Sequence, residues 1–251
     1  MQLSAYVLTC NSEKHLGRVL SQLSRVADDL VVLDSGSTDT TLEIAKQHAA
    51  KIHFRSFDDF IQQREFAASQ CQYDWILFID SDEVIDDHLV NSINQLKAYD
   101  FEQSHNDAYV LRRDWYVLGQ PVHSIYPIKS PDFRVRLYHR ARGHFDPRLP
   151  VHEKLIGFNH VGRVESGAIH HYTFETKEEF DRKLTRYHSL AVETMQRRGK
   201  RSGPIKAQVH AVAAFLKSWL SYQGWRDGRV GIVCARYAYR YTLAKYLGSP
   251  K

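Results

Sequence analysis

The sequence predicts an α/β fold in which a doubly wound, largely parallel sheet is followed by a mixed β region and a helical extension. Strand candidates start at residues 3, 30, 52 and 75, and the segments between them have helical spacing. This alternation is typical of βα units. After about residue 107 the strand candidates follow one another closely, and beyond His171 the apolar spacing becomes helical. We therefore expect three parts, residues 1–100, 101–172 and 173–251.

The first part contains four apolar runs of strand length, at residues 3–9, 30–33, 52–57 and 75–79. We expect them to form the parallel strands. The intervening helices are indicated by Leu16, Val19, Leu20, Leu23 and Val26 in the first segment, by Leu42, Ile44 and Ala45 in the second, and by Phe60, Ile61, Phe66 and Ala67 in the third.

The second part contains strand candidates at residues 108–111, 115–118 and 133–138. Proline cannot donate to a strand ladder, so prolines between and after these runs indicate loops. They are Pro121, Pro127, Pro131, Pro147 and Pro150.

The third part begins with Thr176-Lys177-Glu178-Glu179, a capping box that predicts a helix reaching about Arg198. A basic linker at residues 197–204 follows. Two more helices are expected at about 204–222 and 229–247, with Gly224 and Gly228 between them.

Charge is divided unevenly along the 251 residues, whose net charge is +5. Residues 1–100 hold 8 Lys and Arg against 16 Asp and Glu, and residues 101–251 hold 26 against 13. This asymmetry predicts an anionic partner for the second half. A phosphorylated substrate, an acidic membrane surface and nucleic acid all qualify, but no nucleic-acid-binding motif is present.

Cysteine usage and hydropathy bear on the compartment. Cys10, Cys71 and Cys234 are odd in number and far apart, which fits neither a disulfide framework nor a zinc site and agrees with a reducing compartment. No apolar run approaches the roughly 18 residues of a membrane span. The N-terminus lacks a basic region before its short apolar stretch, so we expect no signal peptide and a cytoplasmic location.

The run from Trp75 to Ile79 leads directly into Asp80-Ser81-Asp82. Side chains at i and i+2 of a strand point the same way, so Asp80 and Asp82 are expected to project together from the carboxyl end. Convergent carboxylates are good ligands for divalent cations, and this edge is where open α/β sheets bind ligands. The alternative is an acidic corner that only caps the next helix.

Polar segments follow all four strand candidates, at residues 9–13, 34–39, 62–64 and 80–82. In a parallel sheet these ends line one crevice. The Gly-rich fingerprints of dinucleotide folds and P-loops are absent, so a nucleotide here would be held by Asp and Asn side chains, with a cation on its pyrophosphate. For Asp34 the alternative is a local Asx turn.

These motifs resemble glycosyltransferase family 2, the inverting enzymes with the GT-A fold. The downstream motifs are similar to those of the lipopolysaccharide core β-1,4-glucosyltransferases that act on inner-core heptose. The first resemblance rests on residues 8–13, 31–39 and 78–83, and the second on Val151-His152-Glu153 and on residues 171–174, 197–201 and 224–229.

The resemblance implies a role for each matching residue. Thr9, Asn11 and Glu13 shape the nucleotide pocket, Asp34 contacts uracil or ribose, Gln63 and Arg64 lie near the donor, Asp80 lies near the ribose, Asp82 binds the metal, and Glu153 is the general base with Asp146 in reserve. Residues 1–100 then bind the nucleotide sugar, residues 101–172 form the acceptor-side mixed β region of the same GT-A domain, and residues 173–251 are the extension.

The implied reaction uses Mg or Mn and moves a hexose, expected to be glucose, from a UDP-sugar to heptose of nascent lipopolysaccharide. The expected place is the inner face of the bacterial inner membrane, in peripheral contact with anionic lipid. Aromatic and basic residues of the last two helices suit such contact, although they suit core packing nearly as well. Two further groups are candidates for contacts with phosphate or metal, namely His170 and His171, and Arg134, Arg136, Arg140 and Arg142.

Two alternatives come from other classes. Asp80-Ser81-Asp82-Glu83-Val84 also matches the Asp-x-Asp-x-[Thr/Val] motif of haloacid-dehalogenase-type phosphatases, with Asp80 as nucleophile. That motif usually sits on the first strand, and no later Gly-Asp motif completes its metal site. The other alternative is a non-catalytic nucleotide-sugar-binding protein, which would bind a donor without turnover.

Overall fold

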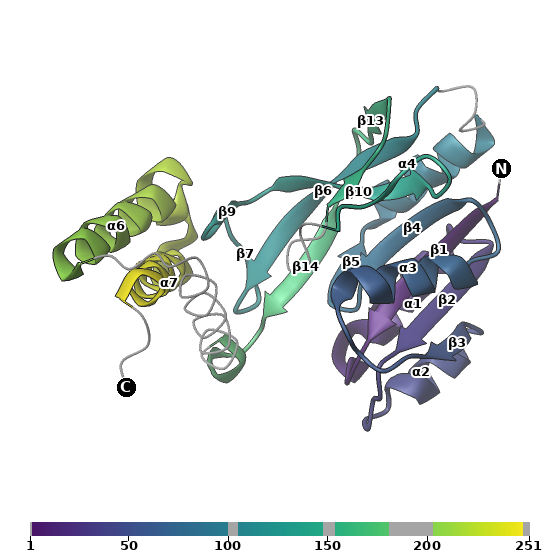
Figure 1. The fold of residues 1–251 in the computed structure, drawn as a ribbon, viewed down its shortest axis with the longest axis horizontal. Coiled ribbons are helices and arrows are strands. Elements are labelled where there is room, and N and C mark those ends of the chain that lie inside the picture. Colours follow the sequence, from purple (N-terminus) through teal and green to yellow (C-terminus); the bar gives the residue numbers. More distant parts are fainter. Residues whose placement is uncertain (1, 100–104, 148–153, 181–202, 248–251) are drawn as a thin grey trace. The chain divides into compact units, whose positions relative to one another are not determined.

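A computed structural model describes residues 2–99, 105–147, 154–180 and 203–247 (Figure 1). The chain divides into two compact units. The first unit comprises residues 1–113 and 133–171, and the second comprises residues 114–132 and 172–251. Each unit is described separately below.

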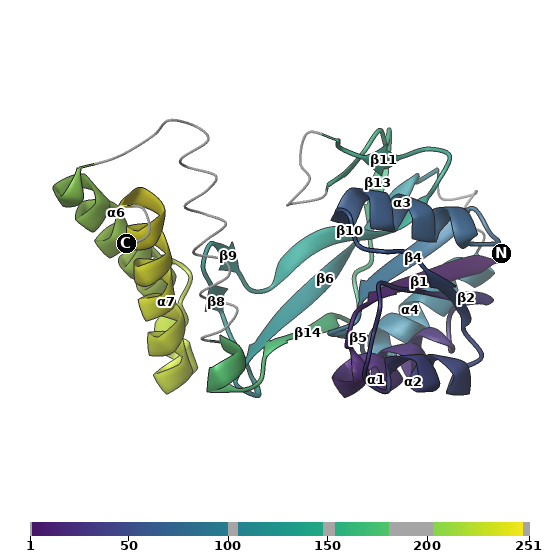
Figure 2. The same cartoon turned by 60° about the horizontal axis from the view of Figure 1, so that its bottom comes forward.

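The first unit begins with the alternating strands and helices that the sequence predicts. Its four parallel strands lie in the order β3-β2-β1-β4. Figure 2 shows α3 on one face of this sheet, with α1 and α2 on the other. The strands are β1 Leu3–Thr9, β2 Asp29–Asp34, β3 Lys51–Phe54 and β4 Trp75–Asp80, and the helices are α1 Glu13–Leu23, α2 Thr41–Gln47 and α3 Phe60–Gln70.

The sheet continues beyond β4 with mixed strands, as expected for the second part of the sequence. β10 pairs antiparallel with β4, and the order then runs β6-β14-β5. The predicted α/β fold class, with a parallel sheet that continues into a mixed β region, is therefore confirmed. These elements are β5 Glu83–Ile85, α4 Asp87–Ala98, β6 Ala108–Val117, β10 Asp132–His139, β11 His144–Phe145, β12 Leu155–Ile156, β13 Val161–Arg163 and β14 Ile169–Phe174.

The register of the parallel strands brings their carboxyl ends to one edge. Thr9 lies opposite Asp34, Leu8 lies opposite Asp80, and Asp34 lies opposite Phe54. This alignment follows from side-by-side packing of apolar runs of similar length, because each strand ends where its polar segment begins. Polar side chains that follow β1, β2 and β4 are therefore neighbours.

Aromatic side chains fill the core between this sheet and α3. Tyr6 of β1 stacks on Phe78 of β4 at 5.7 Å, and Tyr138 of β10 contacts the Phe78 ring edge-on at 6.1 Å. Ile61 and Ala67 of α3 pack against the same cluster. A rigid aromatic layer therefore supports the residue two positions beyond Phe78, which is Asp80.

Two predicted strand boundaries are wrong. β3 ends at Phe54 and not at residue 57. Residues 108–111 and 115–117 belong to one strand, β6, because Arg113 between them is buried on the inward face and does not interrupt the strand. The alternative in which the acidic pair only caps the next helix is also wrong. β5 and α4 follow the pair, and α4 is capped by Asp86, whose side chain accepts from the Leu89 amide at 2.7 Å.

The second unit contains short strands and the C-terminal helices. The capping box forms as predicted: the Glu179 amide donates to Thr176 Oγ1 at 3.1 Å and the Thr176 amide donates to Glu179 Oε2 at 3.4 Å. Residues 181–198 of the expected helix lie outside the described residues. The remaining elements are β7 Gln120–Pro121, β8 Ser124–Ile125, β9 Ile128–Lys129, α6 Pro204–Leu216, a π-helical turn Lys217–Ser221, a 3-10 turn Gly224–Asp227 and α7 Gly228–Leu247.

Two observations complete the second unit. α6 packs along α7, and the buried Asp227 accepts from the amide of His123 at 2.7 Å, which ties the turn before α7 to the loop before β8. Among the described helices of the chain, none is both long and apolar enough to cross a bilayer.

Candidate functional site

The loops after β1 and β2 are joined by side-chain hydrogen bonds. Thr9 Oγ1 donates to Asp34 Oδ1 at 2.9 Å. The other oxygen of Asp34 accepts from the amides of Gly36 and Ser37 at 2.9 and 2.8 Å. The Asx turn that was the alternative for Asp34 is therefore formed, and its contact with a donor stays a prediction.

Asn11 and Glu13 extend this connection at the surface. Asn11, in the left-handed region at φ 51°, accepts from the Thr38 amide at 2.8 Å. Glu13 accepts from the Thr40 hydroxyl at 2.8 Å and from its amide at 3.2 Å. The sequence-predicted residues Thr9, Asn11, Glu13 and Asp34 thus form one interlocked pair of loops at the strand ends.

Hydrogen bonding sets the acidity of Asp34. Burial raises the pKa of its carboxyl, but hydrogen bonds from Ser37, Gly36 and Thr9 outweigh burial and hold the pKa below its usual value. Asp34 is therefore an anion that stabilises its own loop.

Gln63 and Arg64, adjacent on α3, have different surroundings. Gln63 is buried and donates from Nε2 to the carbonyl of Ser56 at 2.8 Å, so it closes the loop between β3 and α3. Arg64 reaches the strand ends and donates to Asp80 Oδ1 at 2.8 Å. The structure therefore brings Arg64 to the site and turns Gln63 into the loop.

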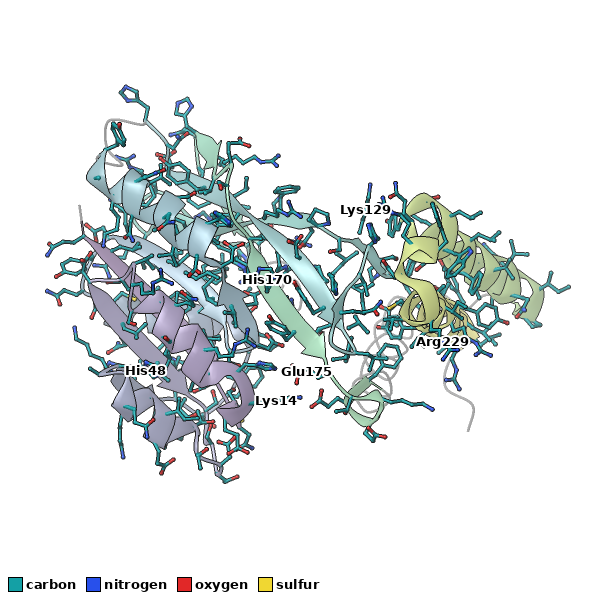
Figure 3. All side chains as sticks on the ribbon, turned by 180° about the vertical axis from the view of Figure 1, so that it is seen from behind. Lys14, His48, Lys129, His170, Glu175 and Arg229 are labelled. Carbon is teal, nitrogen blue, oxygen red and sulfur yellow. The ribbon has the colours of Figure 1, made fainter. Side chains whose placement is uncertain are left out.

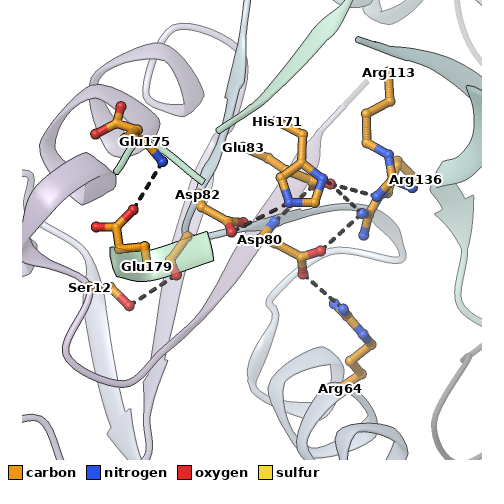
Figure 4. Close-up of polar contacts among 11 residues, drawn as sticks. Ser12, Arg64, Asp80, Asp82, Glu83, Arg113, Arg136, His171, Glu175 and Glu179 are labelled. Atoms are coloured by element: carbon orange, nitrogen blue, oxygen red, sulfur yellow. Dashed lines mark hydrogen bonds and ion pairs between the residues drawn. The ribbon is translucent and has the colours of Figure 1, made fainter. Parts of the chain in front are cut away.

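Asp80 is held between two arginines (Figure 4). Arg64 contacts Oδ1, and Arg136 of β10 donates to Oδ2 at 3.0 Å. Both guanidinium groups lie over the ring of Phe78, at 4.9 and 4.7 Å from its centroid. Burial raises the pKa of Asp80, but the two positive charges lower it more strongly, so the carboxyl stays ionised.

Glu83 is a buried residue beside Asp80 to which the sequence analysis assigned no role. Its fully buried carboxylate accepts from Arg136 at 2.6 Å and from Arg113 of β6 at 2.9 Å, and it also accepts from the Asp80 amide at 3.1 Å. A charge inside a strand is stable only when it is paired. Arg113 between two apolar runs was the available signal, since a cation there requires a buried anion.

Asp82 lies beside His171 of β14, which the mixed strand order brings next to β5. Asp82 Oδ2 is 3.4 Å from His171 Nε2, and His171 Nδ1 is 3.6 Å from Glu83 Oε1. His170 has a different neighbour: its Nε2 is 3.6 Å from Asp86 Oδ2. Of the two histidines, His171 is therefore the one beside the predicted metal ligand.

The residues at this point fit a divalent cation. A carboxylate oxygen and an imidazole nitrogen are both accepted by Mn, and the carboxylate by Mg. Within the described part of the chain, no three His, Cys, Asp or Glu side chains converge as a complete cage. A cation here would thus depend on Asp82, His171 and oxygens of a bound diphosphate or water, which is the usual arrangement for Mg at phosphate sites.

Glu153, the predicted general base, lies outside the described residues. The reserve candidate, Asp146, directly follows β11, and its side chain is only 4 % exposed. Arginines that were candidates for gripping acceptor phosphate have carboxylate partners: Arg136 as described, Arg140 with Asp74 at 2.8 Å and Arg142 with Asp107 at 3.0 Å.

The second unit has a pocket of about 760 Å³ lined by the aromatic Phe180, Phe215 and Tyr237 together with Arg236 and Arg240. None of the sequence-predicted site residues lines it. The volume of this pocket therefore does not identify the predicted donor site.

Comparisons with known proteins identify the family and the fold of the chain. The family model described as "Glycosyl transferase family 2" matches residues 4–144, which include the predicted residues from Thr9 to Asp82 but not Asp146, Glu153, His170 or His171. The matched segment thus contains β1 to β4 and the carboxylates at their ends.

Sequence relatives extend over nearly the whole chain. The lipopolysaccharide core biosynthesis glycosyltransferase LpsC of Rhizobium meliloti is 27 % identical over 242 residues, covering 93 % of this chain and 86 % of the relative. An uncharacterized glycosyltransferase of Rickettsia typhi is 26 % identical over 231 residues, covering 87 % and 76 %.

The solved structures support the fold. Residues 1–349 of Staphylococcus aureus TarS, in complex with UDP-GlcNAc, align with a TM-score of 0.54 at 18 % identity, covering 98 % of this chain and 89 % of that one. The chain spans 40 % of the longer TarS structure, with a TM-score of 0.50. At this identity the likeness establishes a shared GT-A fold.

Proposed function

This chain belongs to glycosyl transferase family 2, and we propose that it is a metal-dependent inverting hexosyltransferase of lipopolysaccharide core assembly. The proposed donor is UDP-glucose and the proposed acceptor is an inner-core heptose. The observation that carries the proposal is the contact of Asp82 with His171. Asp80 lies next to this contact, and its negative charge is balanced by ion pairs with Arg64 and Arg136.

The donor side of the proposal rests on the interlocked loops. Asp34, Asn11 and Thr9 stand at the carboxyl edge, where an open α/β sheet binds a nucleotide. Asp80 and Arg64 follow on the next strand and helix, where ribose and diphosphate would lie. Because Asp80 already carries two cationic partners, its charge does not repel a diphosphate as a free carboxylate would.

Asp82 and His171 would hold the Mg or Mn, which when bound stabilises negative charge on the departing diphosphate. The acceptor hydroxyl loses its proton to the general base, for which Glu153 is proposed and Asp146 is the reserve. The acceptor oxygen bonds to C1 of the sugar as the bond from C1 to the diphosphate oxygen breaks. One displacement inverts the anomeric centre, so an α-linked donor yields a β product.

The acceptor side rests on relatives and on charge. LpsC is named for lipopolysaccharide core biosynthesis, and it matches nearly the full chain. The excess of Lys and Arg in residues 101–251 suits a phosphorylated glycolipid at an anionic membrane surface. We therefore place the reaction at the cytoplasmic face of the inner membrane, with the protein in peripheral contact.

The direct test measures UDP release from UDP-glucose with Mn and a heptose-bearing core glycolipid. The Asp82→Asn variant should lower kcat by at least about 10²-fold, as expected when a group that stabilises developing charge is lost. Asp87→Asn, whose carboxylate is exposed and pairs with Arg25, is the matched control and should retain activity. Equal release by wild type and Asp82→Asn would contradict the proposal.

A second measurement separates metal binding from turnover. Calorimetric titration of UDP should show tighter binding with Mn than with EDTA. Asp82→Asn and His171→Asn should lose this difference, and His170→Asn should keep it. A Mn effect that survives both of the first two variants would place the metal elsewhere.

The remaining alternatives predict different results. Family membership and the arginine-bound state of Asp80 leave the phosphatase without support, because a nucleophilic aspartate must be free to attack phosphorus. A non-catalytic binding protein would bind UDP-glucose without turnover, and Glu153→Gln would change nothing. In an enzyme, loss of the general base lowers kcat by about 10²–10⁴-fold with donor affinity retained.

A further inference from the structure

Helix α6 exposes its bulky aliphatic side chains and buries three of its alanines, Ala207, Ala211 and Ala214. The exposed set recurs at spacings of three and four residues, which places it on one face of the helix and of the turn that follows. We call this face the α6 stripe. Its members and their exposed fractions are Ile205 81 %, Val209 62 %, Val212 42 %, Leu216 46 % and Leu220 58 %.

The opposite face of α6 packs on α7 through small residues. Ala207 and Ala211 are fully buried, as are Cys234 and Ala238 of α7. Small residues let two helix backbones approach closely. The hydrophobic cluster that contains Cys234 and Tyr237 of α7 includes no member of the α6 stripe. The stripe is therefore not a part of the core of the second unit.

A stripe of this size indicates a binding surface. It extends from residue 205 to residue 220, which is about 20 Å along a helix. Monomeric proteins rarely leave contiguous apolar side chains of this kind in water. Trp225, 56 % exposed in the turn before α7, adds an aromatic ring of the type that prefers a membrane interface.

The charges of the segment that contains α6 and α7 are almost all positive. The described segment 203–247 holds seven Lys and Arg and one carboxylate, Asp227, which is buried. Within the described part of the chain, none of the seven cations forms an ion pair. Figure 3 labels Arg229, one of these residues, at the start of α7. They are Lys206, Lys217, Arg226, Arg229, Arg236, Arg240 and Lys245.

These observations discriminate among possible occupants. If a second copy of this chain packed face to face on the stripe, the Lys and Arg residues of the two copies would repel each other. The segment has no exposed carboxylate that could relieve this repulsion. Nucleic acid would pair with the cations but leave the aliphatic side chains in water. An anionic lipid surface accommodates both, because the apolar side chains enter the acyl boundary while Lys and Arg meet the headgroups.

We propose that the α6 stripe is a membrane-docking surface on which the α6–α7 hairpin lies in the plane of an anionic bilayer. The proposal deepens the proposed function by assigning the peripheral contact to one helix face and to anionic headgroups. Docking would also bring the protein to the bilayer surface in which a lipid-bearing acceptor is anchored.

The test is flotation of the full chain with vesicles of phosphatidylglycerol and phosphatidylcholine, compared with vesicles of phosphatidylcholine alone. Wild type should float with the anionic vesicles and much less with the neutral ones. The variant Ile205→Gln/Val209→Gln/Leu216→Gln should lose at least tenfold in apparent affinity. Glutamine is a good helix former and all three positions are exposed, so the fold should persist, as checked by circular dichroism.

The matched control is Val161→Gln, which removes an apolar side chain of similar exposure, 47 %, from β13 of the first unit. It should float like wild type. Lys206→Gln/Lys217→Gln should weaken flotation with anionic vesicles only, because it removes charge and leaves the stripe. UDP binding by the triple variant should match wild type, so failure of the docking proposal is distinguished from failure of the glycosyltransferase proposal.

Three outcomes would overturn the inference. The first is that wild type does not bind anionic vesicles at low salt. The second is that the triple variant floats like wild type. Wild type that is dimeric in solution and becomes monomeric in the triple variant would show that the stripe is an interface between copies.

Discussion

At the residue scale, two carboxylates of one short motif have separate environments. Asp80 ends a strand and is bound by Arg64 and Arg136, whereas Asp82 lies in the turn that follows and contacts His171. The spacing of the two is that of a strand, but the strand ends at Asp80. Asp80 is therefore suited to hold neighbouring groups in place, and Asp82 is the better candidate for direct contact with a cation.

Glu83 carries the largest expected effect on stability. The Glu83→Gln substitution leaves Arg113 and Arg136 buried with a neutral partner, and breaking a buried ion pair costs about 3–5 kcal/mol. Because glutamine can still accept a hydrogen bond, we expect a loss of about 3 kcal/mol. Equilibrium urea unfolding followed by circular dichroism measures it.

The control for that prediction is Asp74→Asn, whose partner Arg140 and own carboxylate are both partly exposed. An exposed pair contributes at most about 1 kcal/mol. Equal losses for the two variants would mean that the buried network around Glu83 has no special role in stability.

The change in the free energy of unfolding with pH should reveal the contribution of the ionised Asp34 carboxylate. Its pKa in the folded chain is below the usual value of about 3.9. A lowered pKa adds stability that is fully present above the unfolded pKa and is lost as pH falls through the folded one. The difference in unfolding free energy between wild type and Asp34→Asn should therefore be constant near neutral pH and shrink below about pH 4.

Urea unfolding of both proteins between pH 7 and pH 3 checks this expectation. A difference that stays constant down to pH 3 would mean that the Asp34 carboxylate does not stabilise its loop.

At the element scale, β6 is one strand where the sequence predicts two, because a residue of β5, distant in sequence, pairs with a charge in its middle. The two apolar runs in residues 108–118 look separate because charged residues lie between them. In the fold, Arg113 points inward to Glu83 of β5 and the strand continues through it. The alternation of inward and outward side chains along β6 is thus preserved, because the paired Arg113 takes an inward position that an apolar residue would otherwise fill.

Asp86 joins two elements and should be a costly cap to lose. It caps α4 through the Leu89 amide and also accepts from the Ala168 amide at 3.1 Å, just before β14. Asp86→Ala should therefore cost more than the roughly 1 kcal/mol of an ordinary N-cap. Asp59→Ala, which removes the cap of α3 alone, is the comparison, and equal unfolding free energies for the two variants would contradict a joining role.

At the scale of the whole molecule, the division of charge predicts how activity responds to salt. The acidic first hundred residues contain the interlocked loops after β1 and β2, and the basic remainder contains the α6–α7 hairpin. Raising KCl from about 0.05 to about 0.5 M shortens the screening length severalfold. Transfer to a vesicle-embedded acceptor should fall several-fold, while transfer to a deacylated, water-soluble acceptor should change much less.

Radiolabelled glucose transfer to the two acceptors, measured in parallel, gives the result. An equal loss on both would place the salt-sensitive step in donor or acceptor chemistry and not in membrane contact.

Much of the site was predictable because it depends on local sequence. Apolar runs ending in Asp34 and Asp80 predict parallel strands with polar carboxyl ends, and the capping box at Thr176 is a local motif that forms as written. The network of Glu83, Arg113 and Arg136 was not predictable, since its members come from β5, β6 and β10 and meet only in the finished sheet.

By itself, the sequence determined the order of strands and helices, the edge at which the polar residues gather and the family to which the chain belongs, because periodicity and short motifs are properties of neighbouring residues. Only the tertiary structure decided that Asp80 is bound by arginines, that His171 and not His170 meets Asp82, and that α6 turns its bulky side chains outward. Those outcomes depend on which strand lies beside which and on which helix face finds a partner, and pairing over long sequence distances leaves no local pattern.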